Sequence, residues 1–492
     1  MPKLSTKHEN GRTIAYTNFS GGLNLALTPE AIADNELQLA ENLEFDPKTG
    51  GLRLRGGLEK VHEFSGPVTD LLTAPESGML LAKSGGHLHT VKLSGNSDVF
   101  VEETKDLGLV EGDGPGVSEL WDDGLLLAFG GGLYKYKIGV LTKITAQDAP
   151  TRVDVLFVRA GRVAVAQAGS DTLRFSGVGD PTRWTTGNDS DSVSLDIGYK
   201  DGCSIRAVVP IVGEVIVFKS PPEQPERGRI YRLQGDYPKW AVIAYSKGAG
   251  AWNPCAAAAV GGDVIFLTKE GMGNLATATE FGDFKLRWAG TKINPRLSPS
   301  LSAGCRIWPL AGRSQVWLGT DADYGDTVWC WHYEIGTGGA WTTLKFPGHV
   351  ASVAQTRGRT YLAIGNAIWH LNENLADDSG TAIIGRLRPK MIMGSHQLLL
   401  KGVVARYYAS ELSKVSVLIE GLELRLPSDF ADDVAFSDND IAFFDNDPLV
   451  PSQMGIAARR RCNIRRWNIT PEFVVRNGLF HVASMELNIA EV

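Results

Sequence analysis

Cysteines are few in this sequence, and none of them pairs at the spacing of a zinc or redox site. The five thiols are scattered at Cys203, Cys255, Cys305, Cys330 and Cys462. An odd total without a CxxC pair does not match the pattern of a metal-binding or disulfide-stapled scaffold. We therefore expect five ordinary reduced thiols in a protein made in a cytosol.

Long apolar segments and catalytic motifs are also missing. No run of eighteen apolar residues occurs, so the sequence predicts no membrane-spanning segment. The first residues carry charges with no apolar stretch behind them, so no signal peptide is expected. There is no HExxH, no GxSxG, no Walker A loop and no strand–GxGxxG–helix unit. These absences favour a protein that is not an enzyme and that holds no cofactor.

Three weaker chemical signals do not reach the pattern of a known site. His87 and His89 fall on one face of an expected strand, but two histidines without a third ligand seldom form a metal site. Residues 438–440 (DND) lack the glycine and the closing glutamate of a calcium loop. Residues 176–184 superficially resemble the Asp box of sialidases, with Asp and Gly in the wrong order. A propeller glycosidase stays the enzyme alternative, because its carboxylate pair is assembled in space.

The charge balance is mildly acidic. The chain has 49 basic and 56 acidic residues, which gives a formal net charge of -7. A protein that grips DNA through its phosphates presents a basic contact face. A mildly acidic surface instead lets DNA pass without sticking, because like charges repel.

Turn-forming residues are abundant and spread along the whole chain. There are 56 glycines, 23 prolines and 12 tryptophans, and none of these is pooled in a linker. Frequent glycine-rich breaks between short apolar runs indicate many short strands. The composition therefore predicts an all-β protein.

A hairpin pattern recurs through the middle of the chain, although no residue-for-residue repeat is visible. Each copy has a glycine or polar turn, an apolar run, a second turn and an alternating apolar run. The seven copies begin at Gly78, Gly124, Gly161, Gly213, Gly262, Arg313 and Gly358. Their spacing is close to the roughly 40–50 residues of a four-stranded blade, which predicts a seven-bladed β-propeller. The alternative is a string of unrelated hairpins in two β-sandwiches.

The limits of this pattern divide the chain into three parts. We predict an N-terminal arm of short helices and a strand over residues 1–65, a β-propeller over 66–375 and a C-terminal β domain over 376–492. In propellers each blade covers its neighbour, so a single blade is not stable by itself. The whole middle part should therefore fold as one domain.

The N-terminal arm is the segment with a convincing helical pattern. Thr28 is placed to cap a short helix with Pro29 in its first turn. Asp34 is placed to cap a second helix over residues 36–42. A strand over residues 52–55 follows. We expect this arm to form part of a platform with the C-terminal domain.

The C-terminal domain has the alternation of a half-buried sheet. Expected strands cover residues 398–408, 415–426 and 459–469. An Asn477-Gly478 turn precedes the last strand. In that strand one face carries Met485, Leu487 and Ile489. The pattern predicts a β-sandwich-like domain with one solvated face.

Two segments of opposite charge lie close together in this domain. The acidic segment contains Asp429, Asp432, Asp433, Asp438, Asp440, Asp445 and Asp447. The basic segment contains Arg459, Arg460, Arg461, Arg465 and Arg466. Such charges are candidates for pairing between neighbouring subunits of a ring. The alternative is a solvated loop beside a basic strand face.

Two groups of residues resemble motifs of the tail nozzle (tail tubular protein B) and packaged-DNA stabilisation proteins of short-tailed bacteriophages. The first group is FSGGLN at residues 19–24, NLEFD at 42–46 and GLRLRGG at 51–57. The second is RFSGVGDPTRW at 174–184, which is similar to a blade turn of that family. The matching positions are Phe19, Gly21, Gly22, Asn42, Arg53, Arg55, Gly56, Gly179, Asp180, Pro181 and Trp184.

The resemblance implies a structural protein of the virion tail, made in the host bacterial cytoplasm. Similar proteins form a homohexameric ring below the adaptor of the head–tail connector and extend the DNA channel. They retain packaged DNA until ejection and carry tail fibres or spikes. The implied partners are other copies of the chain, the adaptor, fibres or spikes, and passing double-stranded DNA that is not read by sequence.

The resemblance carries over no catalytic residues, so the matching positions are expected to be structural. Gly21, Gly22 and Gly56 would permit tight backbone turns, and Trp184 would anchor a blade. The acidic residues between 429 and 447 are our candidate for a channel lining or gate, where carboxylates would repel phosphate. The alternative function is a stand-alone propeller binding module or a propeller glycosidase.

Overall fold

The computed structural model describes residues 11–46, 50–95, 99–167, 169–187, 191–278, 283–287, 289–321, 323, 325–410, 413–426, 441–444 and 455–491. Within these ranges the one α-helix is a single turn, α1 (Asn294–Leu297). Short 3-10 segments are η1 (Pro225–Arg227), η2 (Pro254–Ala256), η3 (Ser298–Ser300) and η4 (Ala311–Arg313). Nearly all other elements are strands, so the protein is all-β.

The chain forms two compact units, and neither is continuous in sequence. The propeller unit contains Glu59–Val328 and Phe346–Leu371. The terminal unit contains Met1–Leu58, Trp329–Lys345 and Asn372–Val492. The chain therefore passes between the units after residues 58, 328, 345 and 371, whereas the sequence analysis places its boundaries after residues 65 and 375. The short middle segment of the terminal unit has no counterpart in the predicted division.

Five complete antiparallel sheets of four strands belong to the propeller unit. The first contains β7 (Val68–Thr73), β8 (Met79–Ser84), β9 (His87–Leu93) and β10 (Val101–Leu109). The second contains β11 (Val117–Trp121), β12 (Gly124–Ala128), β13 (Tyr134–Lys137) and β14 (Val140–Lys143). The third contains β15 (Val155–Arg159), β16 (Arg162–Ala166), β17 (Thr172–Phe175) and β18 (Val193–Asp196). The fourth contains β19 (Ser204–Ile211), β20 (Glu214–Ser220), β21 (Arg229–Gln234) and β22 (Ala241–Lys247). The fifth contains β23 (Ala257–Val260), β24 (Asp263–Thr268), β25 (Gly271–Ala278) and β26 (Asp283–Arg287).

Two further groups of strands bring the number of blades to seven. The sixth starts with β27 (Arg306–Leu310), β28 (Gln315–Gly319) and β29 (Thr327–His332). The seventh contains β31 (Val350–Thr356), β32 (Arg359–Ile364), β33 (Ala367–Asn372) and β6 (Gly57–Glu63). Each of the seven predicted hairpins is the second and third strand of one group. The predicted β-propeller is therefore confirmed.

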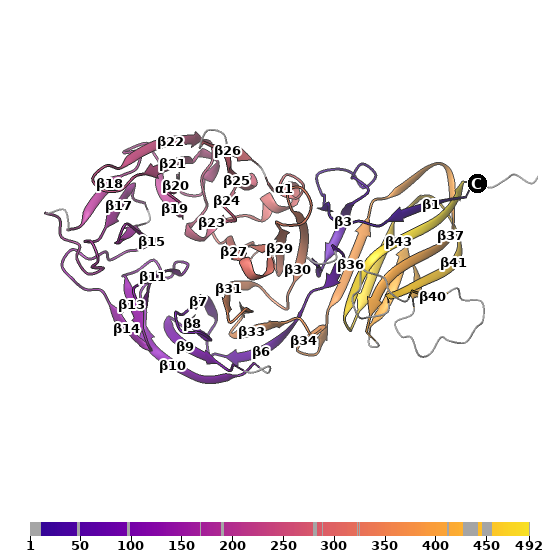
Figure 1. Cartoon of the computed structure of the whole chain (residues 1–492), viewed down its shortest axis with the longest axis horizontal. Helices are drawn as coiled ribbons and strands as arrows, with labels where there is room; N and C mark the ends of the chain where they lie inside the picture. The colour runs from indigo at the N-terminus through magenta and orange to yellow at the C-terminus, as the bar shows by residue number, and fades with distance from the viewer. Residues whose placement is uncertain are drawn as a thin grey trace, which may run out of the picture. The chain divides into compact units, whose positions relative to one another are not determined.

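The blades surround a central axis, and the first strand of each blade is innermost (Figure 1). Innermost strands of successive blades contact one another. For example, β11 contacts β15, and β19 contacts β23. Apolar side chains fill the space between neighbouring blades. Between the third and fourth blades, for example, Phe157 and Phe175 belong to one buried cluster with Val217 and Leu233. Face-to-face burial of this kind is why the middle of the chain folds as one body.

The ring closes where the segment after β6 meets the last blade. The Phe64 N–H donates to the carbonyl oxygen of Asn366 at 2.8 Å, and the Val68 N–H donates to that of Gly365 at 2.9 Å. The Asn366 amide returns a bond to the Phe64 carbonyl oxygen at 3.0 Å. An early strand and the latest hairpin of the propeller thus share one blade.

The terminal unit contains two larger sheets. One has the order β4 (Leu43–Phe45), β5 (Leu52–Leu54), β43 (Phe480–Glu491), β37 (Ile392–Ala409), β41 (Gly455–Ile469) and β40 (Ile441–Phe444), with β1 (Gly11–Tyr16) on β43. The other includes β30 (Ala340–Lys345), β3 (Glu36–Glu41), β36 (Ile384–Pro389), β42 (Pro471–Arg476), β38 (Lys414–Ile419) and β39 (Leu422–Leu426), with β2 (Gly22–Leu23) on β3. A small hairpin pairs β34 (Asp377–Asp378) with β35 (Thr381–Ala382).

These two sheets pack on each other through apolar side chains. Tyr407 of the first sheet lies 6.5 Å, between ring centroids, from Phe473 of the second. Phe480, directly after the Asn477-Gly478 turn, lies 6.2 Å from Phe473. Met485, Leu487 and Ile489 are buried, as their shared face predicts. The terminal unit therefore has the β-sandwich-like packing expected of the C-terminal domain.

The two helices expected in the N-terminal arm are wrong. Residues Glu36–Glu41 form strand β3, in which Leu37 pairs with Pro389 and Ala40 with Leu387. Residues from Thr28 to Ala31 make only a turn, closed by a bond from the Ala31 N–H to the Thr28 carbonyl oxygen at 2.9 Å. Pairing with the distant strand β36 satisfies the backbone and buries Leu37 and Ala40, which outweighs the local preference for helix.

Candidate functional site

A buried arginine joins the N-terminal motif to later parts of the terminal unit. Arg55 is almost fully buried and binds the carboxylate of Asp378 with both terminal nitrogens, at 2.6 and 2.9 Å. It also donates to the carbonyl oxygens of Lys345 at 2.6 Å and Gly56 at 2.8 Å, and to Asn42 Oδ1 at 3.3 Å. This geometry satisfies the guanidinium fork that a buried arginine needs.

Asn42 is the second residue of this network that connects separate segments of the terminal unit. It has a φ of 56°, in the left-handed region, and it separates β3 from β4. Its amide donates to the Ile384 carbonyl oxygen at 2.9 Å, and its side-chain oxygen accepts the Lys345 N–H at 2.7 Å. Asparagine tolerates this backbone conformation better than most residues. Asn42 therefore ends a strand, and not the helix that the sequence analysis predicts.

The other N-terminal motif residues are held by close backbone packing. A Cβ on Gly22, whose φ is 61°, would lie 2.4 Å from the Trp341 nitrogen. A Cβ on Gly21 would lie 2.8 Å from the Asn35 carbonyl oxygen, and one on Gly56 would lie 2.8 Å from that of Asn372. Of these three motif glycines, only Gly22 has a positive φ.

Arg53 and Phe19 complete this group of positions. Arg53 is partly exposed and pairs with Glu373 at 3.1 Å. Phe19 is buried and lines a cavity of about 460 Å³. The cavity also contacts Gly51, Gly336 and His481, so it draws on three separate segments of the terminal unit. Burial lowers the pKa of His481, which favours its neutral form.

The second motif forms a turn in the third blade. Gly179 has a φ of 69°, and Asp180 accepts from the Thr182 N–H at 2.9 Å and from the Thr182 hydroxyl at 2.6 Å. Trp184 donates from Nε1 to the Pro181 carbonyl oxygen at 2.8 Å and is buried among apolar residues of the second and third blades. The turn thus positions a tryptophan between two blades.

The five predicted interface arginines all lie on β41, but the strand directs them to different sides. Arg459, Arg461 and Arg465 are exposed and lie opposite β37 residues of the outer sheet face. Arg460 donates from Nε to the carbonyl oxygen of Arg425 on β39, at 2.8 Å. The structure therefore gathers three of the five on one face.

This face extends beyond β41. Arg406 of β37 is exposed, and its neighbours Ala405 and Tyr407 are buried, so its side chain belongs to the outer face. Arg466 is also exposed and donates to the Arg465 carbonyl oxygen at 2.8 Å. Trp467 follows, with 63% of its surface exposed. Arg406, Arg459, Arg461 and Arg465 together form the basic face of this sheet.

The acidic half of the predicted pairing is formed by seven aspartates. The seven aspartates Asp429, Asp432, Asp433, Asp438, Asp440, Asp445 and Asp447 lie outside the described residues. Their role as a channel lining or gate stays a prediction.

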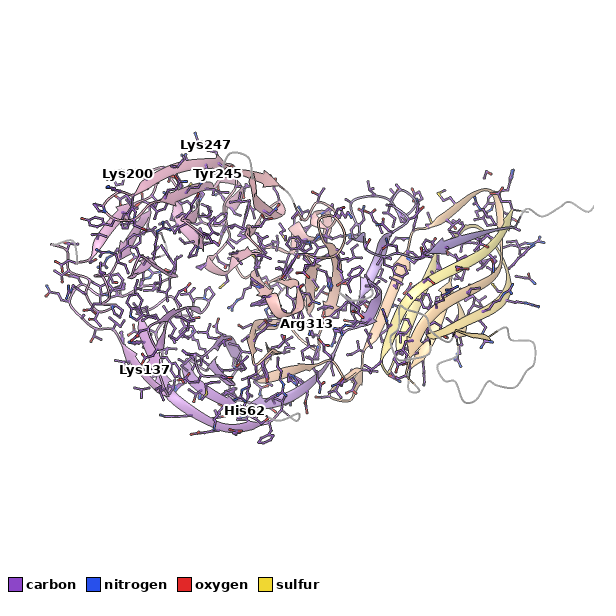
Figure 2. All side chains as sticks on the ribbon, in the orientation of Figure 1. His62, Lys137, Lys200, Tyr245, Lys247 and Arg313 are labelled. Atoms are coloured by element: carbon purple, nitrogen blue, oxygen red, sulfur yellow. The ribbon has the colours of Figure 1, made fainter. Side chains whose placement is uncertain are left out.

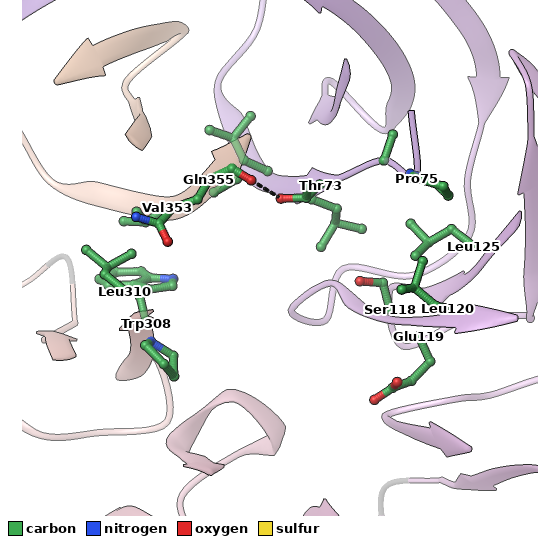
Figure 3. Close-up of a pocket in the computed structure, with 15 residues that line it drawn as sticks. Thr73, Pro75, Ser118, Glu119, Leu120, Leu125, Trp308, Leu310, Val353 and Gln355 are labelled. Atoms are coloured by element: carbon green, nitrogen blue, oxygen red, sulfur yellow. Dashed lines mark hydrogen bonds between the residues drawn. The ribbon is translucent and has the colours of Figure 1, made fainter. Parts of the chain in front are cut away.

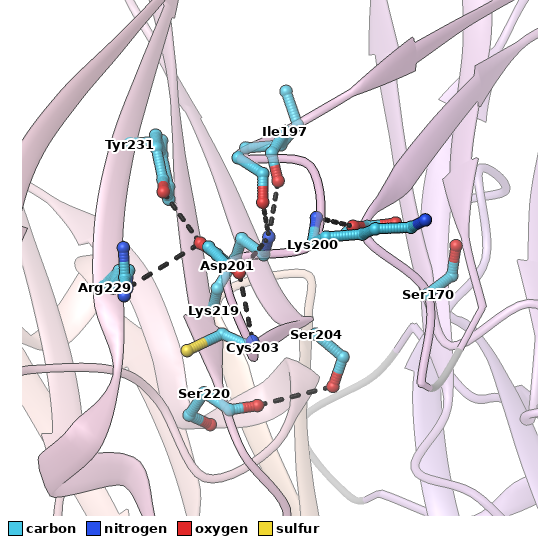
Figure 4. A network of polar contacts seen from close by, with 12 residues as sticks. Ser170, Ile197, Lys200, Asp201, Cys203, Ser204, Lys219, Ser220, Arg229 and Tyr231 are labelled. Atoms are coloured by element: carbon cyan, nitrogen blue, oxygen red, sulfur yellow. Dashed lines mark hydrogen bonds and ion pairs between the residues drawn. The ribbon is translucent and has the colours of Figure 1, made fainter.

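A buried polar network lies between the third and fourth blades (Figure 4). Lys219 is fully buried and donates to Asp201 at 2.9 Å, to the Gly198 carbonyl oxygen at 3.0 Å and to the Ile197 carbonyl oxygen. Asp201 also accepts from the Tyr231 hydroxyl at 2.7 Å. Burial by itself would raise the pKa of Asp201, but the bonds from Lys219 and Tyr231 outweigh it and lower that pKa.

The network is saturated by its own members, so we assign it a structural role. The Lys219 ammonium has three donors, and three oxygens accept from it. Asp201 and Lys219 are too far apart in the sequence for a local pattern to predict this network, because strand β19 and most of β20 lie between them. A lysine within the apolar run of β20 (EVIVFKS) is the one local signal that could have pointed to it.

The paired histidines do not acquire a third ligand. His87 lies 2.9 Å from Asp106, and the rings of His87 and His89 stack with centroids 6.2 Å apart. Among the residues that the structure describes, no group of three His, Cys, Asp or Glu side chains could hold a metal ion. The described part of the chain also has no helix long and apolar enough to cross a membrane.

Comparisons with known proteins give similarity of fold. No protein-family model matches the chain, and neither does any curated protein. The extracellular domain of BT4673 from B. thetaiotaomicron matches with a TM-score of 0.44 and 11% identity, over 81% of this chain and 58% of that chain. The RRP9 WD40 repeats match with a TM-score of 0.41 and 10% identity, over 65% and 99% of the two chains. The Neurospora crassa Pan2 WD40 domain matches with a TM-score of 0.41 and 9% identity, over 65% and 95%. Similarities at this level carry no inference about function.

Proposed function

We propose that this chain is a non-catalytic β-propeller module that binds other macromolecules, and that it acts as a subunit of an assembled ring. Propellers present rigid surfaces built from the loops and edges of their blades, which suits them to carry partners. The terminal unit supplies a second, separate surface for assembly. The chain thus has one part for partners and one part for its own copies.

The finer form of the proposal is a nozzle subunit in the tail of a short-tailed bacteriophage. Such a subunit would form a hexamer below the adaptor, extend the DNA channel and carry fibres or spikes. The observation that carries it is the buried network around Arg55, which ties two motif residues to Lys345 and Asp378. The motif positions are therefore used to build the unit that would form the platform.

The basic face gives this proposal a specific contact. It projects arginine side chains from two neighbouring strands, and arginine is the residue best suited to paired contacts with carboxylates. The chain as a whole is acidic, so the counterpart in this proposal is an acidic surface of a neighbouring copy. Charge reversal on the basic face should then block ring formation.

The test compares two triple variants with the same change of charge. One is Arg459→Glu, Arg461→Glu and Arg465→Glu on the basic face. The matched control is Lys200→Glu, Lys239→Glu and Lys247→Glu on the propeller, where all three lysines are exposed and Lys200 and Lys247 lie at its outer edge (Figure 2). Single-particle electron microscopy and mass photometry would be recorded on each protein, alone and with purified portal–adaptor complex.

We expect six-fold rings on the adaptor for the natural protein and the control, and monomers for the basic-face variant. Rings from the basic-face variant would remove that face from the contact. Natural protein that stays monomeric with the adaptor present would overturn the nozzle proposal and leave the stand-alone binding propeller.

A further inference from the structure

The propeller unit contains a cavity of about 570 Å³ beside its axis, lined by the innermost strands of four successive blades (Figure 3). These strands are β27, β31, β7 and β11. A volume of this size is within the range of pockets that bind small ligands or side chains.

Most of the wall is apolar. Leu71, Leu125, Leu310 and Val353 contribute aliphatic side chains, and Trp308 contributes an indole ring. Such a wall favours the carbon skeleton of a ligand over water. The aromatic ring adds a face that attracts a cation.

The few polar groups of the wall are mostly engaged with each other. The Thr73 hydroxyl donates to the Gln355 carbonyl oxygen at 2.9 Å, and the Gln355 amide donates to the Thr360 hydroxyl at 3.0 Å. The first of these bonds joins the first and seventh blades, and the second lies within the seventh blade. The charge of the cavity wall therefore comes from another residue, Glu119.

Glu119 is the one lining residue that carries a charge. It lies in the middle of β11, and Figure 3 shows its carboxylate directed into the open part of the cavity. No described residue forms a hydrogen bond or ion pair with this carboxylate. Burial raises its pKa, which is the direction expected of a carboxylate that has lost water and gained no partner.

The ion pair between Asp70 and Arg306 does not neutralise it. Asp70 of β7 and Arg306 of β27 bind each other at 2.9 Å, and Asp70 also accepts the Gly116 N–H at 2.8 Å. Neither side chain lines the cavity. The acidic charge of Glu119 is thus left for a ligand to pair with, and hydrogen bonds from a cation would compensate this half-buried carboxylate for the water that it has lost.

We propose that this cavity binds the basic side chain of an arginine or lysine presented by a partner protein. Glu119 would accept hydrogen bonds from the guanidinium or ammonium group, and the aliphatic stem would lie along Trp308 and the leucines. Leu120, which is 65% exposed at the rim, would contact the partner's backbone beside that side chain. This inference does not depend on ring formation, because every residue that lines the cavity belongs to the propeller unit of a single chain.

The test uses capped tripeptides as probes, acetyl-Gly-Arg-Gly-amide and acetyl-Gly-Lys-Gly-amide. The neutral control is the citrulline peptide, which has nearly the shape of arginine without its charge. Methyl NMR of leucine and valine in the full chain reports directly on Leu71, Leu125, Leu310 and Val353. The variant is Glu119→Gln, and the matched control is Glu103→Gln, an exposed residue on β10.

We expect one or both basic peptides to shift the cavity methyl signals, with the citrulline peptide and Glu119→Gln each about tenfold weaker or more. Glu103→Gln should bind as the natural protein does. The same methyl spectra show whether Glu119→Gln is folded. Equal binding by Glu119→Gln, equal binding of citrulline, or no shift with either basic peptide at millimolar concentration would overturn the proposal. Agmatine, which is arginine without its carboxyl group, would also overturn it by binding as tightly as the arginine peptide, since a free small cation would then suffice without a partner protein's backbone.

Discussion

The Lys219 ammonium group is fully buried, and the fold supplies three oxygen atoms that accept its hydrogen bonds. Taking an ammonium and a carboxylate out of water costs several kcal/mol per ion, so the pair is stable only while every partner is present. Removing one partner leaves the other buried and unsatisfied. The network therefore makes the contact between the third and fourth blades sensitive to the ionisation of a single aspartate.

The first prediction concerns Asp201 and pH. Its pKa is lowered in the folded protein, so its stabilising effect is complete above the pKa of an unfolded aspartate, about 3.9, and is lost as the pH falls through the folded value. We expect Asp201→Asn to be less stable than the natural protein at pH 7 by about 3–5 kcal/mol. The difference should shrink below about pH 4. Urea unfolding at stepped pH measures it.

The control for this prediction is Asp323→Asn, at an exposed position of the same unit. It should leave unfolding nearly unchanged at pH 7. A constant difference between Asp201→Asn and the natural protein from pH 7 to pH 2 would contradict the assignment.

Single residues are the scale at which the sequence is least informative. The partners of Arg55 are Asp378, Lys345 and Asn42, and two of them lie far away in the chain. No local pattern marks Asp378 as a partner, because the ion pair depends on how distant segments meet. Resemblance selects Arg55 as a structural position without indicating what it binds. Glu119 gives no signal in sequence either, since β11 reads as an ordinary short strand.

Elements are predicted better, where local pattern and tertiary context agree. The seven hairpins are found because tight turns and apolar runs are local, and each hairpin becomes the centre of a blade. The prediction for β3 fails because local propensity and tertiary context disagree there. Its sequence ELQLAE favours a helix by propensity, yet its backbone pairs with β36, which lies far away in the sequence. The prediction is wrong where the deciding contact is distant.

The second prediction concerns the approach of β2 to β30. A Cβ at Gly22 would lie 2.4 Å from the backbone nitrogen of Trp341, and backbone cannot move aside as a side chain does. Gly22→Ala also places a side chain at a positive φ, which costs about 1–2 kcal/mol by itself. We expect a loss well above that cost, visible as faster hydrogen exchange in β2, β3 and β30.

Gly50→Ala is the matched control, because Gly50 lies in the same unit with a φ of 70° and nothing within 4 Å of its Cβ. It should show only the cost of the positive φ. Similar losses for the two variants would mean that the close approach to Trp341 contributes nothing.

At the scale of the whole propeller, stability depends on how the ring of blades is closed. The seventh blade takes β6 from before the first blade, and Asn366 secures the join by two bonds to Phe64. Buried clusters on both sides of the first blade continue the packing across the join. Opening the ring at this point should therefore be a local event with a measurable free energy.

The third prediction is that Asn366→Ala weakens this join. The variant removes the side-chain bonds to the Phe64 carbonyl oxygen and to the exposed Glu63 carboxylate and keeps the backbone bond, so the loss should be about 1–2 kcal/mol. Hydrogen exchange at Phe64 and Val68 should accelerate by about tenfold, while amides of the third and fourth blades should be unchanged. Acceleration spread evenly over all blades would show that the ring opens elsewhere.

The discontinuous terminal unit has a consequence for the order of events during synthesis. Strands β3 and β5 leave the ribosome early, but their partners β36 and β43 are translated only after the whole propeller. At about 5–20 residues per second, β3 and β5 wait for tens of seconds without these later partners. Meanwhile the propeller can fold as soon as β33 emerges. The terminal unit is therefore completed after the propeller, so a subunit that uses it for assembly becomes competent only once β43 has been translated.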